Sequence, residues 1–270
     1  MMAVSPAVLD QPCPPVYHAR PMLDSAGVRS GRPGGWTGTF ALACGLVSLA
    51  FASGGAGLAT MQLVPPRVGF YLFLAAVPVA ALGLLPGLFA LFRARGGRNP
   101  SARRRARSGI ALGTLTVAAM AGLALPSAGA PMINDITTDL ADPPAFVAAA
   151  ALEANSGRDM AYPEGFAAQQ RRGYDLGPVD LNLPPQEAFE RARRAVASLP
   201  STRIIDADPA AGRIEAVATS RVFHFEDDIV VRIQPTKIGS RIDVRSKSRD
   251  GRGDMGVNAR RIEHLFAILR

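Results

Sequence analysis

Arginine and glycine recur between residues 245 and 261, near the end of the 270-residue chain. Gly251, Gly253 and Gly256 precede a stretch whose apolar spacing predicts a closing helix from about Val257. Unpaired amides at a helix start, with guanidinium groups nearby, suit a phosphate, a carboxylate or an anionic lipid headgroup. The residues predicted to bind such an anion are Arg245, Arg249, Arg252, Asn258, Arg260 and Arg261.

A structural interpretation of the same segment stays open. In it, Asp254 caps the closing helix, the glycines supply turn geometry, and the arginines extend into solvent or pair with acids such as Asp243 and Asp250. A phosphate-binding P-loop is excluded, because the chain has no Gly-x-x-x-x-Gly-Lys-Ser/Thr pattern.

Other reactive side chains are sparse. Glu226, Asp227 and Asp228 follow His224, which suits either cation binding or, more simply, a solvated hairpin tip. The chain has three histidines and no Gly-x-Ser-x-Gly elbow, so a hydrolytic triad has few candidates. The sequence therefore predicts no catalytic residue, no metal ligand and no cofactor, and it leaves open whether the protein is an enzyme.

Long apolar runs precede the arginine-glycine segment and predict transmembrane helices within residues 36–133. About 20 helical residues cross the hydrocarbon core of a bilayer. The three runs are Phe40–Val64, Val68–Phe92 and Ser108–Ile133, and none contains a charged residue or a histidine. A proton or ion pathway would need such residues, so a pump or transporter is disfavoured. The lipid bilayer is therefore a predicted partner.

Basic charge is concentrated around these runs. Up to Ile133, eleven arginines stand against two aspartates, whereas the remaining residues are close to neutral. A sequence pI near 10.4 would suit a nucleic-acid-binding protein. Charge that flanks apolar runs instead indicates membrane topology, so no nucleic-acid partner is predicted.

The arginines also predict an orientation. The segment Arg93–Arg107 holds seven of them and is predicted to lie in the cytoplasm. Residues 1–35, a proline-rich tail predicted to be disordered, then lie on the cytoplasmic side as well. Residues 134–270 are placed across the membrane, in the periplasm of a bacterium whose inner membrane holds the helices.

Residues 134–270 are predicted to form an α+β domain, with an antiparallel meander sheet packed against helices. From Arg241 to Arg249, apolar or small residues alternate with charged ones, so this strand is predicted to turn a charged outer face to water. The predicted helices are Phe146–Ala154, Gln186–Leu199 and the one from Val257, and the predicted strands are Arg203–Asp206, Arg213–Thr219, Arg221–Phe225, Ile229–Ile233 and Arg241–Arg249.

Short segments of this domain resemble a known family. They are Asn134–Asp139 (Asn-Asp-Ile-Thr-Thr-Asp), Asp243–Arg249 and Gly253–Arg261. In these residues the chain resembles the domain-of-unknown-function family 1499, often attached to bacterial membrane helices, over roughly residues 132–270. The resemblance implies a single domain and brings no activity, cofactor or catalytic residue with it.

These features predict an inner-membrane protein of the cell envelope that displays a periplasmic binding domain. Its ligand is expected to be a partner protein or an anionic envelope molecule. The alternative is an envelope hydrolase that acts on lipid or cell-wall material through Asp and Arg side chains. A concave pocket gathering polar side chains would favour the hydrolase, and a flatter basic or apolar face would favour the binding domain.

Overall fold

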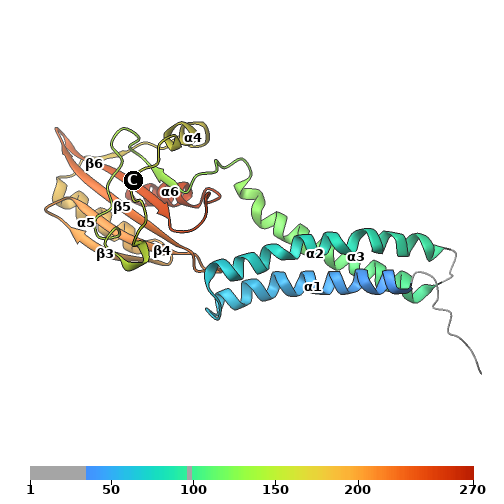
Figure 1. Cartoon of the computed structure of the whole chain (residues 1–270). Coiled ribbons are helices and arrows are strands. Elements are labelled where there is room, and N and C mark those ends of the chain that lie inside the picture. Colours follow the sequence, from blue (N-terminus) through green and yellow to red (C-terminus); the bar gives the residue numbers. More distant parts are fainter. Residues whose placement is uncertain (1–34, 96–98) are drawn as a thin grey trace, which may run out of the picture. The chain divides into compact units, whose positions relative to one another are not determined.

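The computed structural model describes residues 35–95 and 99–270. The predicted tail over residues 1–35 lies outside the described residues, apart from Gly35. Within the described ranges, three helices are long and apolar enough to cross a membrane: α1 (Gly35–Thr60), α2 (Pro66–Arg93) and α3 (Pro100–Ala124). They run side by side (Figure 1), which confirms the predicted long apolar helices.

Small residues let these helices approach closely. A Cβ added at Gly109 of α3 would lie 2.3 Å from the carbonyl group of Ala41 on α1. At Gly45 of α1 it would lie 2.5 Å from the carbonyl oxygen of Gly109, and at Gly55 it would lie 2.5 Å from the backbone nitrogen of Phe73 on α2. Because these separations leave no room for a side chain, the glycines determine how near the helix backbones come.

The helix α3 begins earlier than the apolar run that predicted it. It starts at Pro100 rather than at Ser108, and the side chain of Asn99 caps it by accepting from the N–H of Ala102 at 3.1 Å. Its first turns therefore carry Arg103, Arg104, Arg105 and Arg107. The stems of such arginines can lie along apolar surface while the charged heads reach water, so charge does not end the helix.

The same helix ends earlier than predicted. α3 stops at Ala124 and is followed by the 3-10 turn η2 (Leu125–Ser127), whereas the apolar run continues to Ile133. Gly129, with a φ of 87°, adopts the left-handed conformation that glycine tolerates. Hydropathy measures apolar character and not backbone conformation, so it placed both ends of α3 too late.

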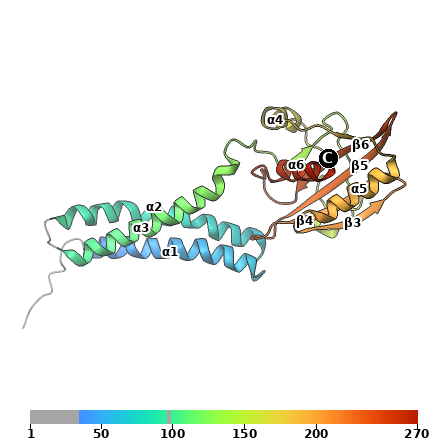
Figure 2. The ribbon, with the colours of Figure 1, turned by 180° about the vertical axis from the view of Figure 1, so that it is seen from behind.

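The C-terminal domain is built on an antiparallel sheet of six strands within the described residues. Neighbouring strands follow the order β1-β6-β5-β4-β3, and β2 also pairs with β6. Figures 1 and 2 show β3 to β6 lying next to one another. The strands are β1 (Asp135–Thr137), β2 (Val179–Leu181), β3 (Thr202–Asp208), β4 (Arg213–Thr219), β5 (Glu226–Thr236) and β6 (Gly239–Ser248). The predicted meander is β3 to β6, and the short β1 and β2 cover the outer edge of β6.

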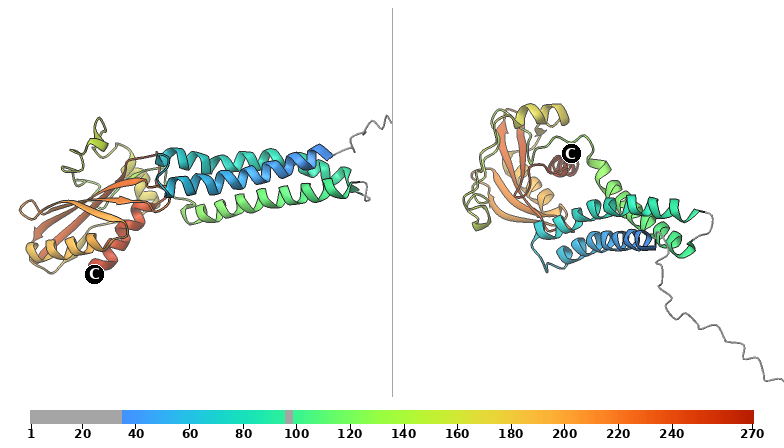
Figure 3. Two further views of the ribbon diagram at one scale, coloured as in Figure 1. Left: turned by 90° about the horizontal axis from the view of Figure 1, so that it is seen from below. Right: turned by 45° about the vertical axis from the view of Figure 1, so that its right-hand side comes forward.

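The helices α5 (Pro185–Ser198) and α6 (Val257–Leu269) lie together on one face of the sheet (Figure 3). Phe189 of α5 and Leu265 of α6 join the core formed by alternate strand residues such as Ile229, Val231 and Val244. The apolar periodicity of both helices therefore predicted the correct face, and the α+β architecture is confirmed.

The segment Phe146–Ala154 is irregular, so the helix predicted there is wrong. The three backbone N–H groups of Val147–Ala149 donate to the buried carboxylate of Glu215 at 2.9, 3.0 and 2.7 Å. A tertiary contact of this kind overrides the helix propensity of the alanines. The chain then forms the 3-10 turn η3 (Glu153–Asn155) and a helix that was not predicted, α4 (Phe166–Gly173).

Residues 221–228 also differ from prediction. Arg221–Phe225 forms a turn rather than a strand, and His224 has a φ of 56° there. Glu226, Asp227 and Asp228 begin β5 instead of forming a solvated hairpin tip. Asp228 is 0% exposed, so this acidic group is part of the packed sheet.

Residues 139–165 supply contacts to the face of the sheet opposite α5 and α6, and we call them the covering segment. Phe146 and Ala149 of this segment pack on Val230 of β5. The charged residues of β6 lie on the same face, with exposed fractions of 0% for Asp243, 2% for Arg245 and 7% for Lys247. The prediction that this charged face lies in water is therefore wrong, because the covering segment encloses it.

Candidate functional site

Arg245 lies within the enclosed charged face of β6. Its guanidinium donates to both carboxylate oxygens of Asp135 on β1, from Nε at 2.9 Å and from Nη2 at 2.8 Å. It also donates to the carbonyl oxygens of Pro144 at 3.2 Å and Met160 at 2.9 Å in the covering segment. The guanidinium is therefore satisfied by the protein itself, and it fastens the covering segment to the sheet.

Aromatic rings of the covering segment flank the same guanidinium. Its central carbon lies 4.8 Å from the ring centre of Phe146 and 5.5 Å from that of Tyr162. Burial, reinforced by the negative charge of Asp135, raises the pKa of Tyr162 to about 12. The phenol therefore keeps its proton at neutral pH and donates it to Oε1 of Gln170 at 3.1 Å.

Lys247 brings a further positive charge to Asp135. Its ammonium group donates to Oδ2 of Asp135 at 2.9 Å. Asp135 is 0% exposed, so one carboxylate holds the charges of Arg245 and Lys247 inside the domain. Buried charges are tolerated when they are paired and hydrogen-bonded, and loss of one partner leaves the others uncompensated.

Arg249 follows β6 and is also bound to acids. Its Nε lies 3.1 Å from both carboxylate oxygens of Asp228, and its Nη2 donates to Oδ1 of Asp228 at 2.6 Å. Its Nη1 donates to Glu226. Asn155 of the covering segment donates to Asp228 at 2.9 Å. The donors of Arg249 therefore point at the acids of β5 and not at an open site.

Asn258 and Arg261, on the first turns of α6, belong to a polar network with the end of β6. The Oδ1 atom of Asn258 accepts from the hydroxyl of Ser246 at 2.6 Å, and its Nδ2 donates to the hydroxyl of Ser248 at 2.9 Å. Arg261 donates to Asp227 at 2.6 Å and also to Asn258. These contacts join α6 to the sheet.

The amides at the start of α6 already have an anionic partner. The carboxylate of Asp254 accepts from the N–H of Gly256 at 2.9 Å and from the N–H of Asn258 at 2.7 Å. Burial raises the pKa of Asp254, and these two hydrogen bonds oppose the rise. Because this carboxylate occupies the helix start, an external anion would have to bind elsewhere on the segment.

The remaining predicted arginines, Arg252 and Arg260, are exposed. Arg260 donates to the carbonyl oxygen of Met255 at 3.1 Å, and neither arginine forms an ion pair with an acid among the described residues. Met255 and Val257 beside them are 51% and 39% exposed. We call these four residues the α6 rim, and they form a basic and apolar surface around the helix start.

A second cluster of paired charges lies on the sheet face that carries Arg245, opposite α5 and α6. Asp243 accepts from Arg241 at 2.9 Å and from Arg232 at 3.4 Å, and Asp139 accepts from the same two arginines at 3.0 and 3.1 Å. Burial raises the pKa of Asp139, but the N–H groups of residues 141–142 and both guanidinium groups outweigh it and lower the pKa. Asp139 is therefore ionised at neutral pH and anchors the start of the covering segment.

These buried ion pairs are suited to holding chain segments in place, and they leave no carboxylate among them free for proton transfer. Asp135, Asp228 and Asp243 each accept hydrogen bonds from cationic side chains. Among the described residues, no group of three or more His, Cys, Asp or Glu side chains is placed to hold a metal ion. The predicted arginines thus separate into buried anchors and the two exposed cations of the α6 rim, and anion binding stays a prediction for the rim.

The sequence-based prediction missed the acids and the covering residues that hold the arginines. Asp135 lies within the Asn134–Asp139 segment on which the family resemblance rests, but a strand of three residues has too little alternation to be predicted. Tyr162 and Phe146 lie in the irregular covering segment, where no periodic pattern marks a buried side chain. Their proximity to Arg245 depends on long-range pairing of the chain.

Neither the comparison with curated proteins nor the comparison with solved structures found a match to this chain. A family model described as "Protein of unknown function (DUF1499)" matches residues 135–269. The match begins at Asp135 and ends with α6, so it includes the sheet, the covering segment and the enclosed charges. The chain therefore belongs to the DUF1499 family of proteins of unknown function.

Proposed function

We propose that the protein is a bacterial inner-membrane protein whose periplasmic C-terminal domain binds an anionic group near the membrane surface. The observation that carries the proposal is the α6 rim, where Arg252 and Arg260 are exposed beside Met255 and Val257. Exposed guanidinium groups next to apolar side chains suit a ligand that presents negative charge on an apolar body. An anionic lipid and an acidic surface of a partner protein both have this chemistry.

The proposed orientation rests on the distribution of arginine. Arg93 and the arginines of the first turns of α3 lie at one end of the helices, whereas the connection between α1 and α2 is followed by Arg67 alone. An excess of arginine in a short connection marks the cytoplasmic side. A cytoplasmic connection between α2 and α3, followed by the crossing of α3, supports a periplasmic position for the domain that comes next.

An envelope hydrolase is the less supported alternative. Such an enzyme needs a carboxylate or histidine that is free to exchange a proton with its substrate. Asp135 and Asp228 are enclosed and bonded to cations, and His224 contacts Gln62 and Thr60. No observation on the described residues favours hydrolysis over binding.

Removal of both rim arginines is expected to weaken binding of an anionic lipid. An arginine near an anionic surface contributes about 1 kcal/mol, so the variant Arg252→Ala/Arg260→Ala should bind roughly thirtyfold more weakly. The full chain in nonionic detergent would be titrated with short-chain phosphatidylglycerol, and separately with inorganic phosphate, by calorimetry. Added salt should weaken the interaction as well.

The matched control is Arg171→Ala/Arg194→Ala, which removes the same charge from exposed positions on α4 and α5. This control should bind like the unmodified chain. Binding of phosphate as well as lipid would indicate a phosphate site, and binding of lipid alone would indicate that the apolar rim residues contribute. Equal affinities for the rim variant and the control, or no binding by the unmodified chain, would contradict an anionic-lipid ligand.

A further inference from the structure

The turn Ser220–Phe225 lies between β4 and β5. Its aromatic residues contact α2, one of the three helices that are long and apolar enough to cross a membrane. The ring centre of Phe223 lies 5.3 Å from that of Phe70 and 5.5 Å from that of Phe73, both in the first turns of α2. The ring of Phe225 lies 5.5 Å from Phe70. These edge-on contacts are typical of packed aromatic side chains, so the turn and the helix share a small apolar cluster.

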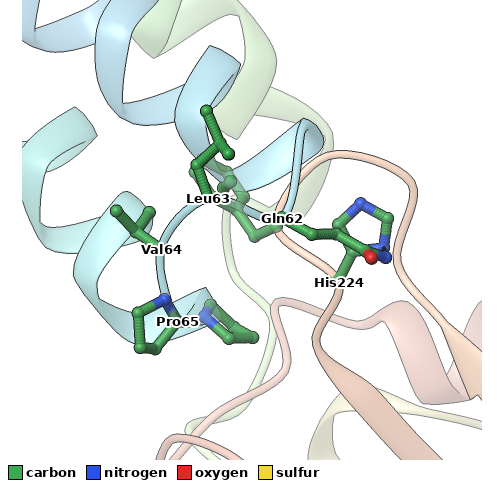
Figure 4. Close-up of a pocket in the computed structure, with 8 residues that line it drawn as sticks. Gln62, Leu63, Val64, Pro65 and His224 are labelled. Atoms are coloured by element: carbon green, nitrogen blue, oxygen red, sulfur yellow. Dashed lines mark hydrogen bonds between the residues drawn. The ribbon is translucent and has the colours of Figure 1, made fainter.

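Polar contacts hold the same turn against the connection between α1 and α2. The hydroxyl of Thr60 lies between two carbonyl oxygens, 2.8 Å from that of Ala56 in α1 and 3.2 Å from that of Val222 in the turn, so its single proton is shared between them. The ring nitrogens of His224 lie 3.4 Å from Nε2 of Gln62 and 3.3 Å from the carbonyl oxygen of Thr60. In Figure 4, His224 lies beside Gln62, and Leu63 and Pro65 line the same pocket. The turn is thus bonded to the end of the helix pair.

The depth of these contacts follows from the length of α2. A 28-residue helix is about 42 Å long, whereas the hydrocarbon core is about 30 Å thick, so roughly 6 Å is left at each end. Phe73 is the eighth residue of α2, about 10 Å from its start at 1.5 Å per residue. A ring that touches Phe73 therefore lies at the boundary between headgroups and acyl chains.

The outward side chains around this cluster are apolar. Val222 is 43% exposed, and Met61, Leu63 and Tyr71 of the neighbouring helix ends are 68%, 64% and 66% exposed. Arg221 is also exposed, at the base of the turn. Apolar and aromatic residues with arginine beside them are the composition that segments at a bilayer interface have.

We propose that the turn Ser220–Phe225 inserts into the bilayer interface, with Val222 among the acyl chains and Arg221 at the headgroups. The inference rests on the proposal that α1 to α3 cross a membrane, because the turn continues the apolar surface of those helices. Its consequence is that the domain has a fixed edge toward the lipid, formed by the end of β4 and the start of β5.

Quenching by brominated lipid tests this insertion. The full chain carries Trp36→Phe to remove its single tryptophan, which is 72% exposed, and Val222→Trp as the reporter. The protein is reconstituted into phosphatidylcholine vesicles brominated either near the headgroup end or deep in the acyl chains. The reporter at Val222 is expected to lose most of its emission with the shallow bromines and little with the deep ones. Arg221→Trp supplies a second reporter beside it.

Two matched reporters separate this inference from the membrane assignment. Leu82→Trp, on an exposed position of α2, should be quenched by deep bromines if the helices cross the bilayer. Ile238→Trp, at the β5–β6 turn and 83% exposed, should not be quenched by either lipid. If Leu82→Trp is quenched while both turn reporters behave like Ile238→Trp, the turn lies outside the lipid and the proposal is overturned. If Leu82→Trp is not quenched either, the membrane-crossing assignment itself fails.

Discussion

Replacing Arg245 with alanine is expected to destabilise the C-terminal domain by about 3–5 kcal/mol. This is the usual cost of removing one partner of a buried ion pair, because the other charge stays buried without compensation. The carboxylate of Asp135, which is 0% exposed in the folded chain, would lose one of its two charged partners. The carbonyl groups of Pro144 and Met160 would lose a donor, and the covering segment would lose its attachment beneath Phe146.

Urea unfolding of the full chain in mild detergent, followed by near-ultraviolet circular dichroism, measures this effect. The matched control is Arg193→Ala, which removes the same side chain from a pair with Glu190 that is 46% and 39% exposed. Exposed pairs contribute about 0–1 kcal/mol, so the control should change the unfolding free energy little. If Arg245→Ala costs no more than Arg193→Ala, the enclosed pairs do not hold the covering segment in place.

Replacing Gly109 with alanine is expected to loosen the helix bundle, at a cost of about 1–3 kcal/mol or more. The new Cβ would lie 2.3 Å from the carbonyl group of Ala41, and backbone cannot move aside as a flexible side chain can. Gly122→Ala on the same helix is the matched control, because a Cβ there meets nothing within 4 Å. Alanine favours the helical conformation over glycine, so the control should be neutral or slightly stabilising.

The thiol of Cys44 reports opening of the bundle directly. It lies on α1, is 8% exposed, and touches the position where a Cβ of Gly83 would stand. In a chain with Cys13→Ser, a maleimide dye reacts with Cys44 as the helices separate on heating in detergent. Gly109→Ala should react at a lower temperature than Gly122→Ala. Identical reaction profiles would mean that the close backbone approach does not limit packing.

The membrane helices could be predicted from sequence because a bilayer imposes length and apolar character on each crossing segment. The start of α3 could not be predicted in the same way. It depends on the cap formed by Asn99 and on arginine stems that continue a helix past the apolar run. Apolar composition alone predicts neither the cap nor the arginine-rich first turns.

The sheet was predicted where each strand has its own alternation, as in β4 and β6. β1 and β2 have three residues each, and their existence depends on pairing with β6, which lies 59 or more residues further along the chain. Alternation in β6 correctly separated its apolar and charged sides. It contained no information on what covers the charged side.

The candidate site was predicted in part for the same reason. The arginines of the segment from Arg245 to Arg261 could be identified by type and spacing, and the role of Asp254 at the helix start followed from local sequence. The partners Asp135 and Asp228 come from other strands, so only the folded chain shows that Arg245 and Arg249 are anchors. Arg252 and Arg260 alone keep the exposure that the anion-binding hypothesis requires.

The side of the membrane on which the domain lies is tested most directly by cysteine labelling in spheroplasts. A chain with Cys13→Ser and Cys44→Ala would carry either Ile238→Cys, at an 83% exposed position of the domain, or Arg95→Cys, in the arginine-rich connection between α2 and α3. With a membrane-impermeant maleimide, Ile238→Cys should be labelled in intact spheroplasts and Arg95→Cys only after permeabilisation. The reverse pattern, or labelling of both positions without permeabilisation, would contradict a periplasmic binding domain carried by three membrane crossings.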